Sequence, residues 1–381
     1  MQYDIAIIGG GLTGVAAARL AAERGFSIVH FAPKFAKDHR TSALMMPTVE
    51  FMLKSRLLRD QNLFGTPLRK IRIIDATNRL LRAPEALFDS AEISLEAFGY
   101  NFANSDLLGA FSDFSSKIDL EDRLVSNILE SAAGFEIHTQ DANVVCATMV
   151  IGADGKKSRV RDSLGFAASA TSFKQSALVA DIEFERVEEN TSVEFHYENG
   201  PFTLVPAGGN KINLVWLDNH DVLEGVAALP TAEFAKRLEE KSHRLFGHAK
   251  PLTKAFVFPL GNLSVRNVGK NGAMLIGEAA HAFPPIGAQG LNLGLRDVED
   301  FIAAIERLSP EFSFDDARRA SEKYNSLRKV DLLRTGGFVD GLFKSLISEF
   351  LPAQGLRLGG VWALKSLGPL RKLAFQFGMG R

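Results

Sequence analysis

The chain has 381 residues, of which 46% are hydrophobic and 23% charged, and its formal net charge at pH 7 is −1. These are the values of an ordinary globular protein, and the near-zero charge excludes the positive field that nucleic-acid binding needs. The single cysteine, Cys146, excludes an intrachain disulfide framework and a cysteine-based zinc site, and the eight histidines lack metal-ligand spacing. We therefore expect no metal, no nucleic-acid partner, no signal peptide, no span of about 18 apolar residues and a cytoplasmic location.

The first predicted elements are a strand, a glycine-rich loop and a helix. The strand lies in Tyr3 to Gly14, YDIAIIGGGLTG, and Val15 to Arg24 continues as a helix rich in Ala and Leu. Gly9, Gly11 and Gly14 occupy the three positions of the dinucleotide-binding fingerprint, which serve a tight turn, close approach to a pyrophosphate and close helix–strand packing. An ordinary strand-to-helix turn is the alternative.

The second predicted strand, Ser27 to Phe31, lacks one part of that fingerprint. An acidic residue that binds the ribose hydroxyls is expected at its end, but Ala32 stands there. His30 and Asp38 are the nearest polar residues, and neither has the expected position. The ribose contact is therefore unassigned.

The next part of the chain reads as a mixture of strands and helices. Strands are predicted at Leu68 to Ile74, Arg79 to Arg82, Phe135 to Thr139 and Val144 to Ile151, and helices at Asn104 to Phe114 and Leu120 to Glu130. The segment from Asp38 to Leu44 reads as a loop. The last of these strands runs into Gly152-Ala153-Asp154-Gly155, a turn with a carboxylate.

From Ala177 to Phe258 the pattern changes to short alternating stretches, which indicate an antiparallel sheet. One helix is predicted within it, from Ala232 to Leu245. Phe256 and Phe258 are apolar enough to line a pocket, but a core position is the safer interpretation. We predict a discontinuous nucleotide-binding domain at 1–65, 100–170 and 265–335, a sheet domain at 66–99 and 171–264, and a C-terminal helical region at 336–381.

A late segment, Met274 to Asp297, reads MLIGEAAHAFPPIGAQGLNLGLRD. An apolar strand ends at Gly277, a loop rich in Gly and Pro follows, and the pattern becomes helical after Gly290. Such a loop delivers a helix N-terminus, which suits an anion or the polar edge of a ring system. His281 is a candidate base, with a structural, hydrogen-bonded histidine as the alternative.

The residues beyond Leu351 carry basic and apolar side chains and no acid. A segment of this kind can lie on an anionic membrane surface. The alternative is a helix packed on the domain with its cations exposed.

Together these motifs resemble the class A flavin-dependent aromatic monooxygenases. Ala153 to Arg161 is similar to that family's second motif, and Gly277-Glu278 to its third, in which Glu278 stands for the usual Asp. The stretch from His281 to Asp297 resembles the ubiquinone-biosynthesis hydroxylase branch. Ser105 departs from the family, since many relatives carry an Arg there. The resemblance implies an α/β fold: an FAD-binding doubly wound domain of the glutathione-reductase-like Rossmann variety, with an inserted antiparallel β-sheet substrate domain and a helical C-terminal tail.

The resemblance also implies site residues. The flavin carries the chemistry, so Pro285 and His281 are the only catalytic candidates. The implied FAD contacts are Gly9, Gly11, Leu12, Thr13, Gly14, Arg40, Thr41, Asp154, Gly155, Glu278, Pro285, Gly287, Gln289, Gly290, Leu291 and Asn292.

The implied activity is hydroxylation of the aromatic ring of a polyprenylated phenol in ubiquinone biosynthesis, through a flavin C4a-hydroperoxide. It uses O₂, FAD and NAD(P)H or another reductant, beside other ubiquinone-biosynthesis proteins on the inner membrane surface. One alternative is a soluble NAD(P)H-dependent hydroxylase of a small aromatic acid. The other is a non-catalytic lipid-binding accessory protein with the same fold.

Overall fold

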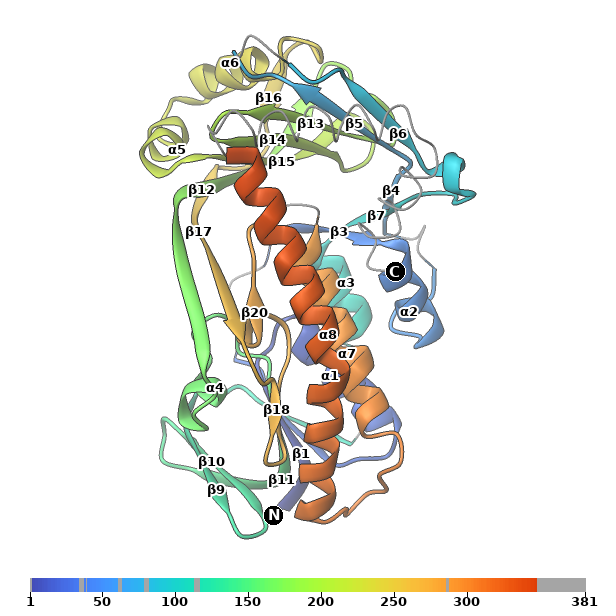
Figure 1. Ribbon diagram of the computed structural model, residues 1–381, viewed down its shortest axis with the longest axis vertical. Coiled ribbons are helices and arrows are strands. Elements are labelled where there is room, and N and C mark those ends of the chain that lie inside the picture. The colour runs from blue at the N-terminus through green and yellow to red at the C-terminus, as the bar shows by residue number, and fades with distance from the viewer. Residues whose placement is uncertain are drawn as a thin grey trace.

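The computed structural model describes residues 2–33, 38, 40–60, 64–78, 82–112, 117–285 and 288–347, with the backbone alone at 335, 336 and 338–347. Two large sheets lie at opposite ends of the long axis, and two long strands of the second sheet, β12 (Ala168–Phe184) and β17 (Phe256–Val265), extend toward the first (Figure 1). Helices α1 (Leu12–Glu23), α7 (Gln289–Ala304) and α8 (Phe314–Ile347) lie along one side of this arrangement. The predicted α/β fold with a parallel sheet and an antiparallel sheet is confirmed.

Within the described residues, the first sheet has eight strands, in the order β18-β19-β11-β1-β2-β8 with β10 and β9 added beside β11. Its strands are β1 (Gln2–Ile8), β2 (Ile28–Phe31), β8 (Ile118–Glu121), β9 (Val125–Ser131), β10 (Gly134–Thr139), β11 (Val144–Gly152), β18 (Gly269–Lys270) and β19 (Ala273–Leu275). The central strands β19, β11, β1, β2 and β8 are parallel. The apolar runs of β1 and β2 are buried on both faces, as expected for the central strands of a parallel sheet.

The second sheet has nine described strands, in the order β20-β17-β12-β15-β14-β13-β5-β6 with β16 beside β12. Its strands are β5 (Lys70–Asp75), β6 (Ala86–Asp89), β12 (Ala168–Phe184), β13 (Thr191–Tyr197), β14 (Gly200–Pro206), β15 (Lys211–Asn219), β16 (Ala249–Pro251), β17 (Phe256–Val265) and β20 (His281–Ala282). All pairs are antiparallel except β13 with β5. Strand β20 belongs to the late Gly/Pro segment, so this segment contacts both sheets.

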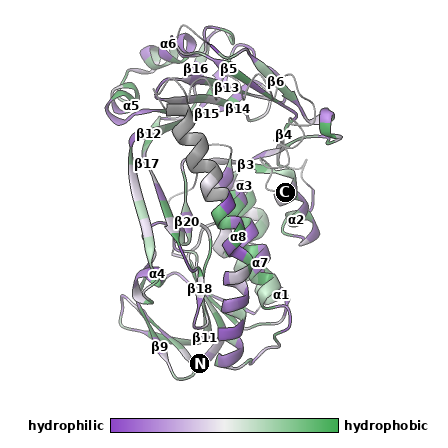
Figure 2. Ribbon diagram, viewed as in Figure 1, coloured by the Kyte–Doolittle hydropathy of each residue, from purple (hydrophilic) through white to green (hydrophobic). Residues whose placement is uncertain are grey.

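A small antiparallel sheet lies between the two large ones, in the order β3-β7-β4 (Figure 1). Its strands are β3 (Thr41–Met45), β4 (Thr66–Leu68) and β7 (Gly99–Ala103). The helices are α1 (Leu12–Glu23), α2 (Met46–Lys54), α3 (Asn104–Phe111), α4 (Arg159–Ser163), α5 (His220–Ala227), α6 (Thr231–Lys241), α7 (Gln289–Ala304) and α8 (Phe314–Ile347), with short 3-10 turns η1 (Ser90–Ile93) and η2 (Gly277–Ala279). Figure 2 shows both purple and green stretches along α8, as expected for a helix with one face on the domain and one in solvent.

The prediction of a helix from Leu120 to Glu130 is wrong, because β8 and β9 occupy this segment. Val125 and Ile128 are buried three positions apart, which is a helical spacing. The spacing arises from a shift in the pairing of β9 with β10, beside the step from His138 to Thr139. An extra residue in one strand changes which side chains share a face.

Three other predictions differ from the structure. The single predicted helix at Ala232 to Leu245 corresponds to α6, and α5 precedes it as a second helix. Residues Thr41–Met45 form a strand instead of a loop. Of the predicted strand at Arg79 to Arg82, residues 79–81 lie outside the described residues and Arg82 is not in a strand.

Candidate functional site

The loop between β1 and α1 has a shape that needs glycine at two positions. Gly9 has a φ of +125°, and a β-carbon there would lie 2.1 Å from the carbonyl oxygen of Ala153. A β-carbon on Gly14 would lie 2.0 Å from the carbonyl oxygen of Gly9. At Gly11, by contrast, no atom of the described residues lies within 4 Å of the β-carbon position, apart from those of Gly11 and its chain neighbours. The loop is therefore packed against the turn after β11 and open beside Gly11.

His30 of β2 contacts this loop through a hydrogen bond to Gly9. Its side chain is buried, and its Nε2 lies 2.9 Å from the carbonyl oxygen of Gly9. Burial lowers the pKa of His30, although the hydrogen bond to Gly9 opposes the shift, so Nε2 is the donor of a neutral ring. The sequence marks His30 only as a polar residue near the missing ribose acid. Ala32, which replaces that acid, lies beside Gly10, whose β-carbon would be 3.1 Å from that of Ala32.

Asp154 lies in the turn that follows β11. Its Oδ2 accepts hydrogen bonds from the backbone N–H groups of Arg159 at 2.6 Å and Val160 at 3.2 Å. Its buried Oδ1 has no hydrogen-bond partner among the described residues. Burial raises the pKa of Asp154, although hydrogen bonds, first that of Ser158, act against the shift. Gly155 beside it has a φ of +77° and no described atom within 4 Å of its β-carbon position.

The turn at Gly277 brings the N-terminal loop and the late segment together. A β-carbon on Gly277 would lie 2.9 Å from Thr13 Oγ1, and one on Gly294 of α7 would lie 2.6 Å from Thr13 Cγ2. Thr13 therefore lies between η2 and α7. The Glu278 side chain is 57% exposed, and its Oε1 lies 3.9 Å from Nζ of Lys156, two residues after Asp154. The three sequence motifs thus meet at one place.

Helix α7 begins at Gln289, directly after Ala288 with a φ of +54°. Within the described residues no side chain caps α7 or α1, and neither first turn contains an acidic residue. Gly290 has no described atom within 4 Å of its β-carbon position. The first backbone N–H groups of both helices, including that of Leu291, therefore form positive, uncapped ends suited to negative groups.

The side chain of Asn292 ties α7 to β3. Its Oδ1 accepts from the backbone N–H of Met45 at 2.9 Å, and its Nδ2 donates to the carbonyl oxygens of Ala43 at 2.9 Å and Ala288 at 2.5 Å. The side chain is buried. The sequence implies Asn292 only as an FAD contact and does not predict this tie to β3, because Met45 and Ala43 are some 250 positions away in the chain.

Four predicted FAD contacts have not yet been described: Arg40, Thr41, Pro285 and Gly287. Arg40 pairs with Asp38, with Nε 2.8 Å from Oδ1, and Thr41 is the first residue of β3. Burial would raise the pKa of Asp38, but hydrogen bonds from Arg40 and Asn104 outweigh it and the pKa is lowered. Pro285 is exposed, and Gly287 lies outside the described residues.

A protein-family model described as "FAD binding domain" matches residues 2–307 of this chain. The chain belongs to the FAD-binding monooxygenase family. It is 28% identical to ubiquinone hydroxylase UbiL of Rhodospirillum rubrum, over 99% of this chain and 89% of the relative. It is 25% identical to 3-demethoxyubiquinol 3-hydroxylase of Escherichia coli K12, over 99% of this chain and 98% of the relative.

Solved structures show the same fold. p-Nitrophenol 4-monooxygenase PnpA from Pseudomonas putida DLL-E4 superposes with a TM-score of 0.79 at 18% identity, over 100% of this chain and 99% of that one. The probable FAD-dependent monooxygenase pqsL from Pseudomonas aeruginosa superposes with a TM-score of 0.78, over 95% of this chain and 100% of that one, also at 18% identity.

The geometry of the site fits FAD, which combines a negative pyrophosphate, several hydroxyl groups and an aromatic ring system. Two uncapped helix N-termini suit its negative groups. The unpartnered Oδ1 of Asp154 and the exposed carboxylate of Glu278 are acceptors for hydroxyl groups. Gly11, Gly155 and Gly290 each leave open the space that a β-carbon would fill.

His281, the candidate base, is not accessible to solvent. Its side chain is 2% exposed, and its Nε2 lies 2.6 Å from Oδ2 of Asp297, which is also buried. Its ring stacks on Phe283 with centroids 5.9 Å apart. These contacts favour the structural alternative over a base that meets substrate.

Arg161 is buried, unlike the basic residues Lys156, Lys157 and Arg159 that precede it in the chain. Its side chain is buried, and it donates from Nη1 to the carbonyl oxygen of Ala279 at 3.3 Å and from Nη2 to that of Lys156 at 2.9 Å. Arg161 therefore holds the turn of Asp154 against η2.

Proposed function

We propose that this FAD-dependent monooxygenase hydroxylates the aromatic ring of a polyprenylated phenol on the route to ubiquinone, with NAD(P)H or another reductant as electron donor. The observation that carries the proposal is similarity over nearly the full length to ubiquinone hydroxylases of two bacteria. The oxygen that enters the ring comes from O₂ activated by reduced FAD. The chain's own residues then have to hold the cofactor, orient the phenol and exclude water.

In the proposed site, the predicted contacts divide by chemistry. Gly11 with Leu12 and Thr13 at the start of α1 would face the pyrophosphate. Asp154 and Glu278 would accept hydrogen bonds from hydroxyl groups, and the start of α7 would face the polar edge of the flavin ring.

Two half-exposed aromatic rings on one face of the second sheet support a substrate with an apolar chain. Phe256 and Phe258 of β17 are 52% and 43% exposed, so they are not core residues. They pair directly with Val179 and Ala177 of β12, and residues directly opposite in an antiparallel pair lie on the same face. The other face carries the buried core that includes Leu178. Two large, half-exposed aromatic rings on one strand suit a prenyl chain.

Polar groups on the same face suit the phenol ring. Asp181 and Asn213 pair directly across β12 and β15, and Asn213 Nδ2 donates to Asp181 Oδ1 at 2.6 Å. Asn101 of β7 donates to Asn213 Oδ1 at 2.6 Å. Asn101 lies opposite Ala43 of β3, the strand that Asn292 ties to α7. This face therefore adjoins the cofactor end of the molecule, and Asp181 offers a carboxylate to a ring hydroxyl.

We place the reaction at the surface of a membrane, where a polyprenylated phenol would reside. Among the helices of the described residues, none has the length and hydropathy of a membrane span. On α8, Val330 and Leu333 are 72% and 71% exposed and lie one turn apart. The predicted basic, apolar segment beyond Leu351 lies outside the described residues, and its contact with an anionic membrane remains part of the proposal.

The test is a lipid profile of a strain from which the gene has been deleted and that contains no second hydroxylase. We expect loss of ubiquinone and accumulation of a prenylated precursor that lacks one hydroxyl group. Restoration of the gene should restore ubiquinone. Normal ubiquinone in the deletion strain would contradict the pathway assignment.

Purified protein separates the alternatives. FAD-loaded enzyme should consume NAD(P)H faster with a prenylated phenol than with simple hydroxybenzoates. The opposite preference would indicate a hydroxylase of small aromatic acids. Protein that cannot be loaded with FAD at all would indicate an accessory protein.

A further inference from the structure

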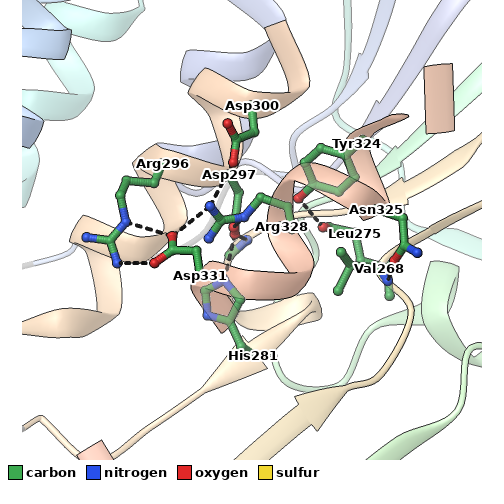
Figure 3. Close-up of polar contacts among 11 residues, drawn as sticks. Val268, Leu275, His281, Arg296, Asp297, Asp300, Tyr324, Asn325, Arg328 and Asp331 are labelled. Carbon is green, nitrogen blue, oxygen red and sulfur yellow. Dashed lines mark hydrogen bonds and ion pairs between the residues drawn. The ribbon is translucent and has the colours of Figure 1, made fainter. Parts of the chain in front are cut away.

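A buried cluster of charges connects the turn at Gly277 with the C-terminal helix α8 (Figure 3). Asp297 of α7 is its centre. Oδ2 of Asp297 accepts the backbone N–H of Gly277 at 2.7 Å and lies 2.6 Å from Nε2 of His281, and its Oδ1 lies 2.7 Å from Nε of Arg328. Oδ2 of this one carboxylate therefore takes part in hydrogen bonds, and Oδ1 has an ion pair with Arg328 that lacks hydrogen-bond geometry.

Arg328 of α8 contacts three carboxylates. Besides Asp297, its Nη1 lies 2.8 Å from Asp300 and 2.7 Å from Asp331, and its side chain is 2% exposed. Burial would lower the pKa of Arg328, but the charges around it, first that of Asp297, raise it. A buried guanidinium is stable only with such partners, and each partner depends on it in turn.

The cluster acts on the backbone beside Glu278. The peptide N–H that Asp297 accepts belongs to Gly277, whose left-handed φ of +59° brings it against Thr13. Glu278 follows directly, and its charged neighbours hold it only loosely: Nζ of Lys156 lies 3.9 Å from its Oε1, and the Arg40 guanidinium attracts it through space. The direction of Glu278 is therefore set by the fixed turn and little else among the described side chains.

We propose that Arg328 is a positioning residue for the cofactor site: through Asp297 it fixes the Gly277–Glu278 turn, so that helix α8 controls how tightly FAD is held. The proposal rests on the proposed contact of Glu278 with FAD. It assigns α8, which lies outside the sequence motifs of the site, a part in cofactor binding.

The experiment compares FAD affinity with stability in purified variants. Arg328→Met removes the charge at similar volume. Arg328→Lys keeps the charge but offers a single nitrogen, whereas Arg328 reaches its carboxylates with both Nε and Nη1. Arg296→Met is the matched control. Arg296 belongs to the same cluster, but it pairs at 2.9 Å with Asp331, which contacts Arg328 and not Asp297 in this cluster. FAD dissociation constants come from flavin fluorescence during titration of the apoprotein, and unfolding midpoints of the apoproteins from circular dichroism.

We expect Arg328→Met to weaken FAD binding at least tenfold and to shift the absorption bands of the bound flavin. Arg328→Lys should recover part of the affinity, and Arg296→Met should stay within threefold of the wild type. If Arg328→Met does not fold, the double variant Asp297→Asn/Arg328→Met, which removes one charge of each sign, takes its place with the same expectation.

A folded Arg328→Met or double variant that binds FAD within threefold of the wild type, with unchanged absorption bands, would overturn the proposal. Glu278→Gln separates this failure from that of the site assignment. Weakened FAD binding in Glu278→Gln alone would retain the site and reject the role of Arg328. Unchanged binding in Glu278→Gln would reject the contact on which the proposal rests.

Discussion

Gly9 and Gly11 lie two positions apart in one loop, but a side chain at each would meet different surroundings. Gly9→Ala places a β-carbon 2.1 Å from a backbone oxygen at a φ of +125°, so we expect a loss of about 4 kcal/mol of unfolding free energy or failure to fold. Gly11 has an ordinary φ of −75°, and the space that a β-carbon would fill is open. The Gly11→Ala apoprotein should therefore keep its stability within about 1 kcal/mol. FAD affinity should nevertheless fall at least tenfold. Urea unfolding and FAD titration of both variants check this, and full FAD affinity in Gly11→Ala would contradict the proposed site.

Asp154 predicts a pH dependence. Burial makes its pKa higher in the folded than in the unfolded protein, whose value is near 3.8. A carboxyl group with a raised pKa contributes its full stability below the unfolded pKa and loses it as the pH rises through the folded pKa, by about 1.4 kcal/mol for each pH unit that separates the two pKa values. Asp154→Asn does not titrate, so the stability of the variant relative to the wild type should increase between about pH 4 and pH 7. Urea unfolding of the apoproteins across this range measures the difference, and a constant difference would refute the expectation.

At the scale of residues, the sequence was a better guide to glycines than to buried polar groups. Gly9 and Gly14 were predictable because their backbone constraints act over a short loop. Asn292 and His30 act through partners in other elements, and a single sequence does not show which elements lie side by side. Asp297 was inside a recognised motif, but its contact with Arg328 could not be predicted for the same reason.

At the scale of elements, Asn292 joins α7 to the small central sheet. Asn292→Ala leaves the backbone N–H of Met45 and the carbonyl of Ala43 without their partner, so we expect a loss of about 2–3 kcal/mol of unfolding free energy. The control Asn143→Ala removes one exposed hydrogen bond, to Asp141, and should cost about 0.5 kcal/mol or less. Equal losses in urea unfolding would show that the tie between α7 and β3 has no special weight.

Most strands and helices were predictable from periodicity, and the exceptions have local causes. The shifted pairing of β9 with β10 produced a helical spacing of Val125 and Ile128 within a strand. Helix α5 was missed because its eight residues, His220–Ala227, follow β15 without a break. Short elements carry too few turns for their period to be read.

At the scale of the whole molecule, the two large sheets are connected by strands that the sequence does not mark as special. β12 has 17 residues, and β17 pairs along it and then with β20 from the cofactor segment. Any substrate held by the second sheet is thereby placed relative to η2 and α7. The alternation of β12 predicted a strand, but its length and its partners come from tertiary pairing, and the proposed domain limits remain predictions.

The exposed rings of Phe256 and Phe258 give a test at this scale. The double variant Phe256→Ser/Phe258→Ser removes side chains that are 52% and 43% exposed, so stability should fall by no more than about 1 kcal/mol. Covering each half-exposed ring with a prenyl chain would contribute about 1 kcal/mol, so KM for a long-chain phenol should rise on the order of tenfold or more. KM for a short-chain phenol and the FAD affinity should change little, because neither uses this face. The matched control Leu129→Ser/Val144→Ser removes side chains that are 47% and 50% exposed on the first sheet. An equal rise of KM in the control, or with the short-chain phenol, would exclude this face as the site of the apolar chain.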